Sequence, residues 1–128
     1  MQIKIESNTK INAIYKGFSI KTDQSVAGGG ENSAPAPFDL FLASIGTCAG
    51  FYIKSFCAQR NISTDGIKKK KKMHYNQAER RIGGIDIEVK LPQDFPAKYK
   101  NALLQAAGAC AVKKHILNPP EFSIYATE

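Results

Sequence analysis

Alternating apolar and polar residues dominate the first part of the chain and predict three short strands. The strands are expected at residues 2–7, 11–15 and 18–22, with a tight connection at Lys16-Gly17. Residues 23–36, DQSVAGGGENSAPA, break this pattern, and their glycines, serines and proline are typical of a loop. A loop of this length is long enough to be functional or mobile.

The longest uncharged run of the chain is Leu40–Ile53, LFLASIGTCAGFYI. It predicts a helix over residues 37–60 that is buried on nearly all sides. Pro37 suits the first position of a helix, and the carboxylate of Asp39 suits its first turn. The run is shorter than the roughly twenty apolar residues that cross a bilayer, so we expect no membrane span.

The remainder of the chain predicts a hairpin, two helices and a final strand. Their ranges are 66–76 with 79–91 for the hairpin, 96–107 and 109–117 for the helices, and 121–126 for the strand. The strands and helices thus come in blocks, in the order β-β-β-α-β-β-α-α-β. This order predicts a single α+β domain over residues 1–128 with a largely antiparallel sheet.

Charge is concentrated in one place. The net charge is +7, but five consecutive lysines, Lys68–Lys72, account for most of the excess. Lysines on an edge strand commonly prevent pairing with other sheets, and we expect that role here. The alternative is a polyanion-binding module that uses the Lys68–Lys72 run with Arg80 and Arg81.

Cysteine usage and missing motifs exclude several classes of protein. Three cysteines form no framework of paired disulfides, and no secretory signal opens the chain, so we expect a cytoplasmic protein. The chain has no dinucleotide-binding glycine motif, no P-loop and no zinc-site spacing of Cys and His. We therefore expect no metal and no cofactor, and nucleic acid is not the expected partner.

The cysteines are the remaining reactive groups. Cys48 lies in the middle of the long helix, and Cys57 follows nine residues later, about 13 Å along the axis and on another face. Those two cannot form a disulfide in an intact helix, and Cys57 is expected to be a passive core residue. Cys110 begins a short helix with Lys113 and Lys114 on its own face, an arrangement that favours a thiolate. The alternative is that these lysines point to water and the cysteine to the core.

Two segments carry a resemblance to a known family. The stretch GGGENSAPAPFDLFLASIGTC, with AAGACAVKKHI placing a second cysteine 62 residues later, resembles the OsmC/Ohr family of thiol peroxidases. The resemblance implies an intertwined homodimer, in which antiparallel sheets from both subunits surround two long central helices. It also implies organic hydroperoxides as substrates and an external dithiol as reductant, in defence against oxidative stress.

The resemblance assigns roles to the two cysteines. It implies Cys48 as the peroxidatic thiol and Cys110 as the resolving thiol. Around this pair we expect Asp39, Lys113 and Lys114 as supporting residues, and Phe38 and Phe51 as substrate contacts.

Two features depart from the family pattern and point to the shorter OsmC-like branch. Phe38 stands where characterised peroxidases have a glutamate, and no arginine precedes the loop. Lys16 or Lys21 could supply a point charge, but not the fork geometry of a guanidinium. The alternative function is therefore a non-catalytic protein of this fold that binds a small apolar or electrophilic ligand at the dimer interface.

Overall fold

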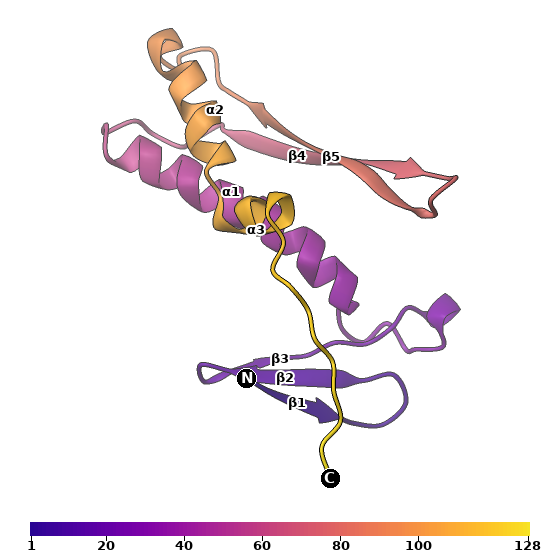
Figure 1. Ribbon diagram of the computed structural model, residues 1–128. Helices are drawn as coiled ribbons and strands as arrows, with labels where there is room; N and C mark the ends of the chain where they lie inside the picture. The colour runs from indigo at the N-terminus through magenta and orange to yellow at the C-terminus, as the bar shows by residue number, and fades with distance from the viewer. The chain divides into compact units, whose positions relative to one another are not determined.

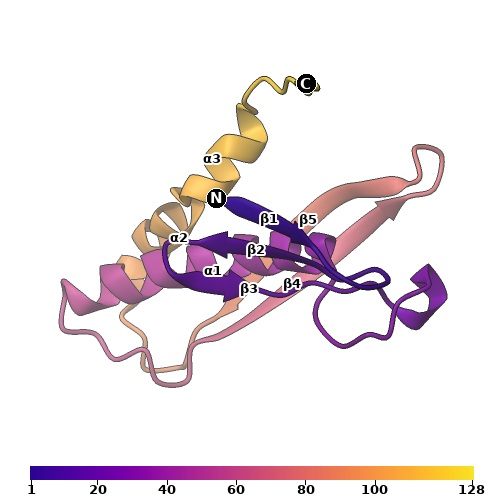
Figure 2. The ribbon, with the colours of Figure 1, turned by 90° about the horizontal axis from the view of Figure 1, so that it is seen from below.

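The computed structural model describes residues 1–128, which divide into two units, Met1–Ser44 and Ile45–Glu128. In the first unit, strands β1 (Gln2–Ile5), β2 (Ile11–Tyr15) and β3 (Phe18–Ile20) form an antiparallel sheet in the order β1-β2-β3 (Figures 1 and 2). The tight connection at Lys16-Gly17 is confirmed. Both residues have positive φ, 50° and 82°, as the turn of a two-residue hairpin requires.

The loop after β3 is held by one buried carboxylate, that of Asp23. The Oδ1 atom accepts hydrogen bonds from the Thr9 hydroxyl at 2.6 Å and from the Gln24 amide at 2.8 Å. The Oδ2 atom accepts from the amides of Glu31 and Ser33 and from the Ser33 hydroxyl, at 3.2, 3.0 and 2.7 Å. Five donors on one fully buried carboxylate therefore fix a segment that otherwise contains only the short 3-10 helix η1 (Val26–Gly28).

We expect Asp23→Asn to lower the stability of the protein. The asparagine NH2 group is a donor, and it would face N–H and O–H groups that are donors themselves. The Thr9 hydroxyl, followed by the amide and hydroxyl of Ser33, holds the pKa of Asp23 well below its usual value. A carboxyl with a lowered folded-state pKa stabilises the fold above its unfolded-state pKa, about 3.9, and loses that contribution as pH falls. Thermal unfolding between pH 2.5 and 7 should therefore depend less on pH in Asp23→Asn than in the wild type. Equal pH dependence in the two proteins would contradict this prediction.

Helix α1 (Pro37–Ala58) begins in the first unit and runs through the second, close to the predicted range. The Asp39 carboxylate accepts a hydrogen bond from the Ala36 amide at 3.1 Å, which places it at the start of the helix. The expectation that this helix is buried on nearly all sides is wrong for the single chain. In the second unit one stripe is buried, at Ile45, Ala49, Ile53, Phe56 and Cys57. The other faces are covered only in part within one chain, and Phe51 is 65% exposed.

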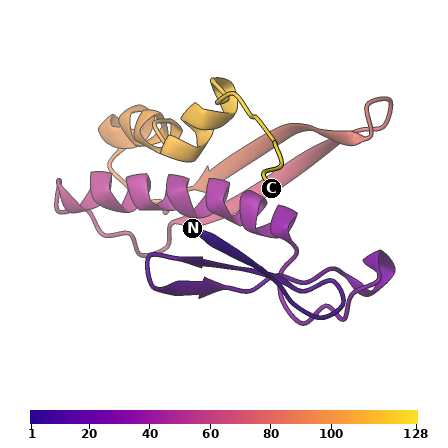
Figure 3. The same cartoon turned by 60° about the horizontal axis from the view of Figure 1, so that its bottom comes forward.

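The second unit is completed by a hairpin and two short helices. Strands β4 (Lys68–Asn76) and β5 (Arg81–Lys90) pair antiparallel; the 3-10 helix η2 (Ala97–Tyr99) leads into α2 (Lys100–Gly108), and α3 (Ala111–Leu117) follows. Leu103 of α2 packs with Ile53, Phe56 and Cys57 of α1 to form the core. Figure 3 shows α2 and α3 one after the other along α1.

The strand predicted at residues 121–126 is absent from the structure. After α3 the chain continues without secondary structure, and Phe122, Ile124 and Tyr125 are 86%, 100% and 81% exposed. A strand needs a hydrogen-bonded neighbour, and this segment pairs with none of the strands in its own chain.

Candidate functional site

Two cysteines far apart in the sequence meet where α3 begins. Cys48, half-buried in the middle of α1, and Cys110, 1% exposed just before α3, have their thiol groups in hydrogen-bond contact. Both are free thiols. Cys57 lies apart from them in the core with Leu103, and burial raises the pKa of its thiol. Cys48 and Cys110 are therefore the candidate reactive pair of the chain.

Cys110 is the N-cap residue of α3. Its Sγ atom accepts a hydrogen bond from the backbone amide of Lys113 at 3.4 Å. The amides of Ala111 and Val112, the first two residues of the helix, lower the pKa of Cys48, and the amide of Val112 acts on Cys110 as well. The first turn of α3 thus presents its free N–H groups to the two sulfur atoms.

These contacts make the two thiols unequal. A hydrogen bond from the Cys110 thiol, together with the amides of Val112 and Ala111, lowers the pKa of Cys48. Burial, and then the hydrogen bond to Cys48, raises the pKa of Cys110. Of the two, Cys48 therefore ionises more readily, and Cys110 is the thiol that donates to it.

We expect Ala111→Pro to weaken Cys48 as a nucleophile without breaking α3. Proline lacks the amide that donates to Cys48, but it suits the first position of a helix, and Cys110 already has the extended ψ of 130° that a following proline requires. A hydrogen bond to a charged group contributes about 1.5–3 kcal/mol, so its loss leaves less of Cys48 ionised at a given pH. The loss is partly offset because a more basic thiolate is a stronger nucleophile. Alkylation of Cys48 at pH 6–7 should slow by roughly threefold to tenfold.

Peptide mapping after a timed pulse of iodoacetamide measures this effect. In the wild type Cys48 should be modified at lower pH than Cys110 or Cys57, because a lowered pKa keeps more thiolate at any given pH. Ala111→Gly is the matched control, because it changes the same side chain and keeps the backbone amide. Equal alkylation rates in the proline and glycine variants would contradict the role of this amide.

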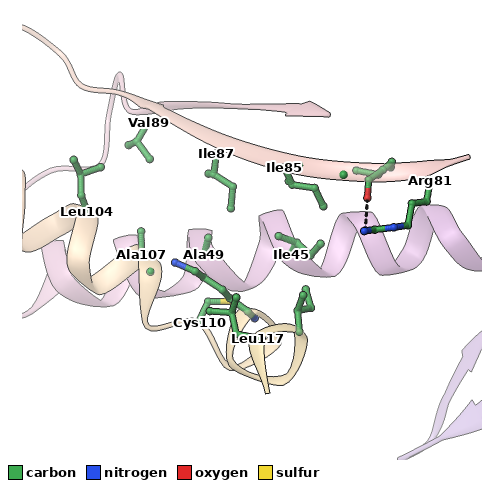
Figure 4. A pocket seen from close by; sticks show the side chains of 16 residues that line it. Ile45, Ala49, Arg81, Ile85, Ile87, Val89, Leu104, Ala107, Cys110 and Leu117 are labelled. Atoms are coloured by element: carbon green, nitrogen blue, oxygen red, sulfur yellow. Dashed lines mark hydrogen bonds between the residues drawn. The ribbon is translucent and has the colours of Figure 1, made fainter. Parts of the chain in front are cut away.

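An apolar cavity of about 540 Å³ adjoins Cys110 (Figure 4). Its apolar walls come from α1, β5, α2 and α3, through Ile45, Ala49, Ile85, Ile87, Val89, Leu104, Ala107, Ile116 and Leu117. The alternation predicted for the second strand of the hairpin is confirmed, since Ile85, Ile87 and Val89 all face this cavity. A small apolar molecule could therefore lie beside the thiol pair.

The charged and aromatic residues considered in the sequence lie in different places. Lys113 lines the cavity and Lys114 does not. Phe38 and Phe51 are both exposed and neither lines the cavity. Asp39 is occupied at the start of α1, nine residues before Cys48. Of these five residues, only Lys113 belongs to the cavity.

The lysine run is divided by the pleat of β4 into two faces. Lys69 and Lys71 stand opposite Val89 and Ile87, on the apolar face of the hairpin. Lys69 reaches α1, where a methyl group at Gly50 would overlap its ammonium group. The other three lysines share their face with Asp86 and Glu88, and Lys72 lies 3.8 Å from Glu88. A run shared between two faces and partly neutralised does not form a continuous cationic surface, which argues against polyanion binding.

Sequence reasoning missed the amides of Ala111 and Val112. Backbone groups have no side-chain signature, and only the predicted start of a helix near Cys110 pointed toward them. It also missed that β5 supplies a wall of the cavity, because the pattern of β5 predicts an apolar face but not what lies against it.

Comparisons with known proteins identify the family and the fold of the chain. A family described as OsmC-like protein matches residues 29–124. The chain is similar in structure to an osmotic stress induced and detoxification response protein from Psychrobacter arcticus 273-4, with a TM-score of 0.73 and 22% identity over 88% of this chain and 84% of that one. No curated protein matches the sequence significantly. At this identity the structural likeness establishes the fold.

Proposed function

The chain belongs to the OsmC-like protein family, and from this premise we propose that it is a thiol-dependent peroxidase that reduces organic hydroperoxides. The observation that carries the proposal is the contact between the Cys48 and Cys110 thiols. A peroxidase of this kind needs one ionised sulfur and a second sulfur within reach. Here the lowered pKa falls on the half-buried Cys48, and the partner thiol is already beside it.

The reaction proceeds in three balanced steps. The Cys48 thiolate attacks one oxygen of the hydroperoxide, the O–O bond breaks, and the other oxygen takes a proton and leaves as an alcohol. The Cys110 thiol then attacks the sulfenic sulfur of Cys48, which forms the disulfide and releases water. An external dithiol finally supplies two electrons and two protons and restores both thiols. The apolar cavity would hold the organic part of the substrate.

Main-chain amides take the role that a side-chain cation has in the family pattern. The chain lacks the family glutamate and arginine, and Asp39 does not replace them. The amides of Val112 and Ala111 supply positive partial charge at the Cys48 sulfur without a charged side chain. This arrangement supports catalysis despite the two departures.

Intact-mass measurement tests the proposal. One equivalent of an organic hydroperoxide should remove two hydrogen atoms from the protein, and peptide mapping should find Cys48 joined to Cys110. Persistence of two free thiols after excess hydroperoxide would overturn it. Thermal stabilisation by an apolar hydroperoxide that is not consumed would instead support the second candidate, a ligand-binding protein, which the apolar cavity favours.

We propose further that the functional form is a cytoplasmic homodimer. Phe51 of α1 and the segment after Pro120 expose large apolar side chains, and exposed apolar surface of this kind commonly marks a protein–protein contact. α1 is long and apolar enough to cross a membrane by length and composition alone, as core helices of soluble proteins also are. A second copy would cover these surfaces, and the segment at 121–126 would pair as a strand with that copy.

Sedimentation equilibrium tests the dimer. We expect the full chain, without detergent, to sediment as two copies of 14.0 kDa. Removal of residues 121–128 should shift the population toward single chains, because the exposed strand-forming segment would be lost. Phe122→Ser with Ile124→Ser is a second variant that keeps the chain length. A stable monomer of the full chain would contradict the proposal.

A further inference from the structure

Lys113 is placed beside the thiol pair by its own backbone. Its amide donates to the Sγ atom of Cys110 at 3.4 Å, in the first turn of α3. Its side chain turns back toward the end of α2, where the ammonium nitrogen lies 3.5 Å from the position that a methyl group on Gly108 would take. Gly108 precedes Cys110 by two residues, so their Cα atoms are at most about 7 Å apart. The ammonium group of Lys113 therefore lies near Cys110, and both residues line the apolar cavity.

Arg81 is the second charged residue of the cavity wall, and its guanidinium group is engaged. It forms an ion pair with Glu79 and donates to the Ile82 carbonyl at 3.5 Å (Figure 4). No aspartate or glutamate lines the cavity, and Lys113 forms no ion pair within the chain. Lys113 is therefore the cation that a molecule bound next to the thiols would meet.

The reduction of a hydroperoxide by Cys48 needs a proton at the leaving oxygen. When the sulfur bonds to the terminal oxygen, the O–O bond breaks, and the oxygen that carries the organic group leaves with the electron pair. A positioned acid commonly accelerates such a step by about 10²–10⁴-fold. The apolar cavity would hold the organic group, so the leaving oxygen would lie where the cavity meets the thiols, which is where Lys113 lies.

We propose that Lys113 is the general acid of hydroperoxide reduction, an inference that rests on the proposed function. Its ammonium group gives a proton to the leaving alkoxide oxygen as the O–O bond breaks. The products are the alcohol, the sulfenic acid of Cys48 and the neutral amine of Lys113, which then takes a proton from solvent. An ammonium group has three donor hydrogens and is a far stronger acid than an alcohol, so this transfer is favourable. The Cys110 thiol stays available for the attack that forms the disulfide.

Two oxidants with different leaving groups test this role on the full-length protein. Cumene hydroperoxide releases an alkoxide, which needs a proton, whereas 3-chloroperbenzoic acid releases a carboxylate, which needs none at pH 6. We expect Lys113→Met, which keeps a long unbranched side chain, to lower the rate constant for oxidation of Cys48 by cumene hydroperoxide about 100-fold. The rate constant for the peracid should change by less than about threefold. Rapid mixing without reductant, followed by an acid quench and intact-mass measurement, gives both rate constants.

Lys100→Met is the matched control, because it removes one positive charge from the start of α2 and that residue does not line the cavity. It should react with both oxidants at the wild-type rates. Equal losses for both oxidants in Lys113→Met would mean that Lys113 only maintains the structure of the site, and would overturn the inference.

An unchanged rate with cumene hydroperoxide in Lys113→Met would overturn the inference as well, because Cys110 or water would then supply the proton. In both of these cases the wild type still reacts, so the peroxidase proposal stands. If the wild type itself does not react with cumene hydroperoxide, the peroxidase proposal fails, and the role of Lys113 as its general acid fails with it.

Discussion

Replacement of Cys48 by serine is expected to abolish hydroperoxide reduction, with kcat/KM lowered by at least about 1000-fold. A serine hydroxyl is not ionised at neutral pH, and its oxygen cannot accept the peroxide oxygen as sulfur does. Hydroperoxide consumption in the presence of excess dithiothreitol, followed for cumene hydroperoxide by chromatography, measures the effect. The reduced protein should otherwise keep its fold, since serine is similar in size.

Cys57→Ala is the matched control for Cys48→Ser. Cys57 lies in the same helix but in the core with Ile53 and Leu103, away from the thiol pair. Its loss should lower stability modestly and leave the rate within about twofold of the wild type. Substantial turnover by Cys48→Ser, or loss of turnover in Cys57→Ala, would contradict the assignment of Cys48 as the attacking thiol.

The second large effect is expected from Cys110→Ser. This variant should react with one equivalent of hydroperoxide but form no disulfide within the chain, because the only sulfur in contact with Cys48 is gone. The sulfenic acid at Cys48 should then persist long enough to react with dimedone. In the wild type we expect dimedone labelling to be at least about tenfold lower, since Cys110 captures the intermediate first.

Mass spectrometry of the dimedone adduct distinguishes these outcomes. Equal labelling of the wild type and Cys110→Ser would mean that Cys110 does not resolve the intermediate. Cys110→Ala provides a second form of the variant without a hydroxyl, and it should give the same labelling if the missing thiol is the cause. Absence of labelling in all three proteins would count against oxidation of Cys48 itself.

Local patterns predicted much of the fold because they depend on neighbours in the sequence. Lys16-Gly17 marked a two-residue turn, and Asp39 marked the start of a helix; both are confirmed. The alternation at Ile85, Ile87 and Val89 identified the inner face of β5. Each of these signals lies within a few residues of the structure it specifies.

The remaining errors concern surfaces that a single chain leaves uncovered. The apolar residues of α1 predicted burial on nearly all sides, but one chain covers a single stripe in its second unit. The segment at 121–126 has the composition of a strand, yet hydrogen bonding to a neighbouring strand is what makes one. Both segments fit the homodimer that we propose, in which a second copy would lie against them. An apolar pattern predicts that a surface is buried, but not whether the same chain or another one buries it.

The thiol site was predictable only in part. The resemblance placed Cys48 and Cys110 as a pair, and the structure brings them into contact. Lys114 does not line the cavity, the Asp39 carboxylate is engaged at the start of α1, and the supporting roles of both residues stay predictions. The groups that lower the pKa of Cys48 are instead its partner thiol and backbone amides, and amides are present at every residue except proline.

Contact between the two sulfur atoms also bears on how the protein would survive a large dose of oxidant. A sulfenic acid that meets a second hydroperoxide becomes a sulfinic acid, which ordinary thiols do not reverse. With Cys110 beside Cys48, disulfide formation is an intramolecular step, whereas oxidation by a second hydroperoxide is bimolecular and slow at low micromolar oxidant. Irreversible inactivation should therefore begin only at oxidant concentrations far above those that sustain turnover.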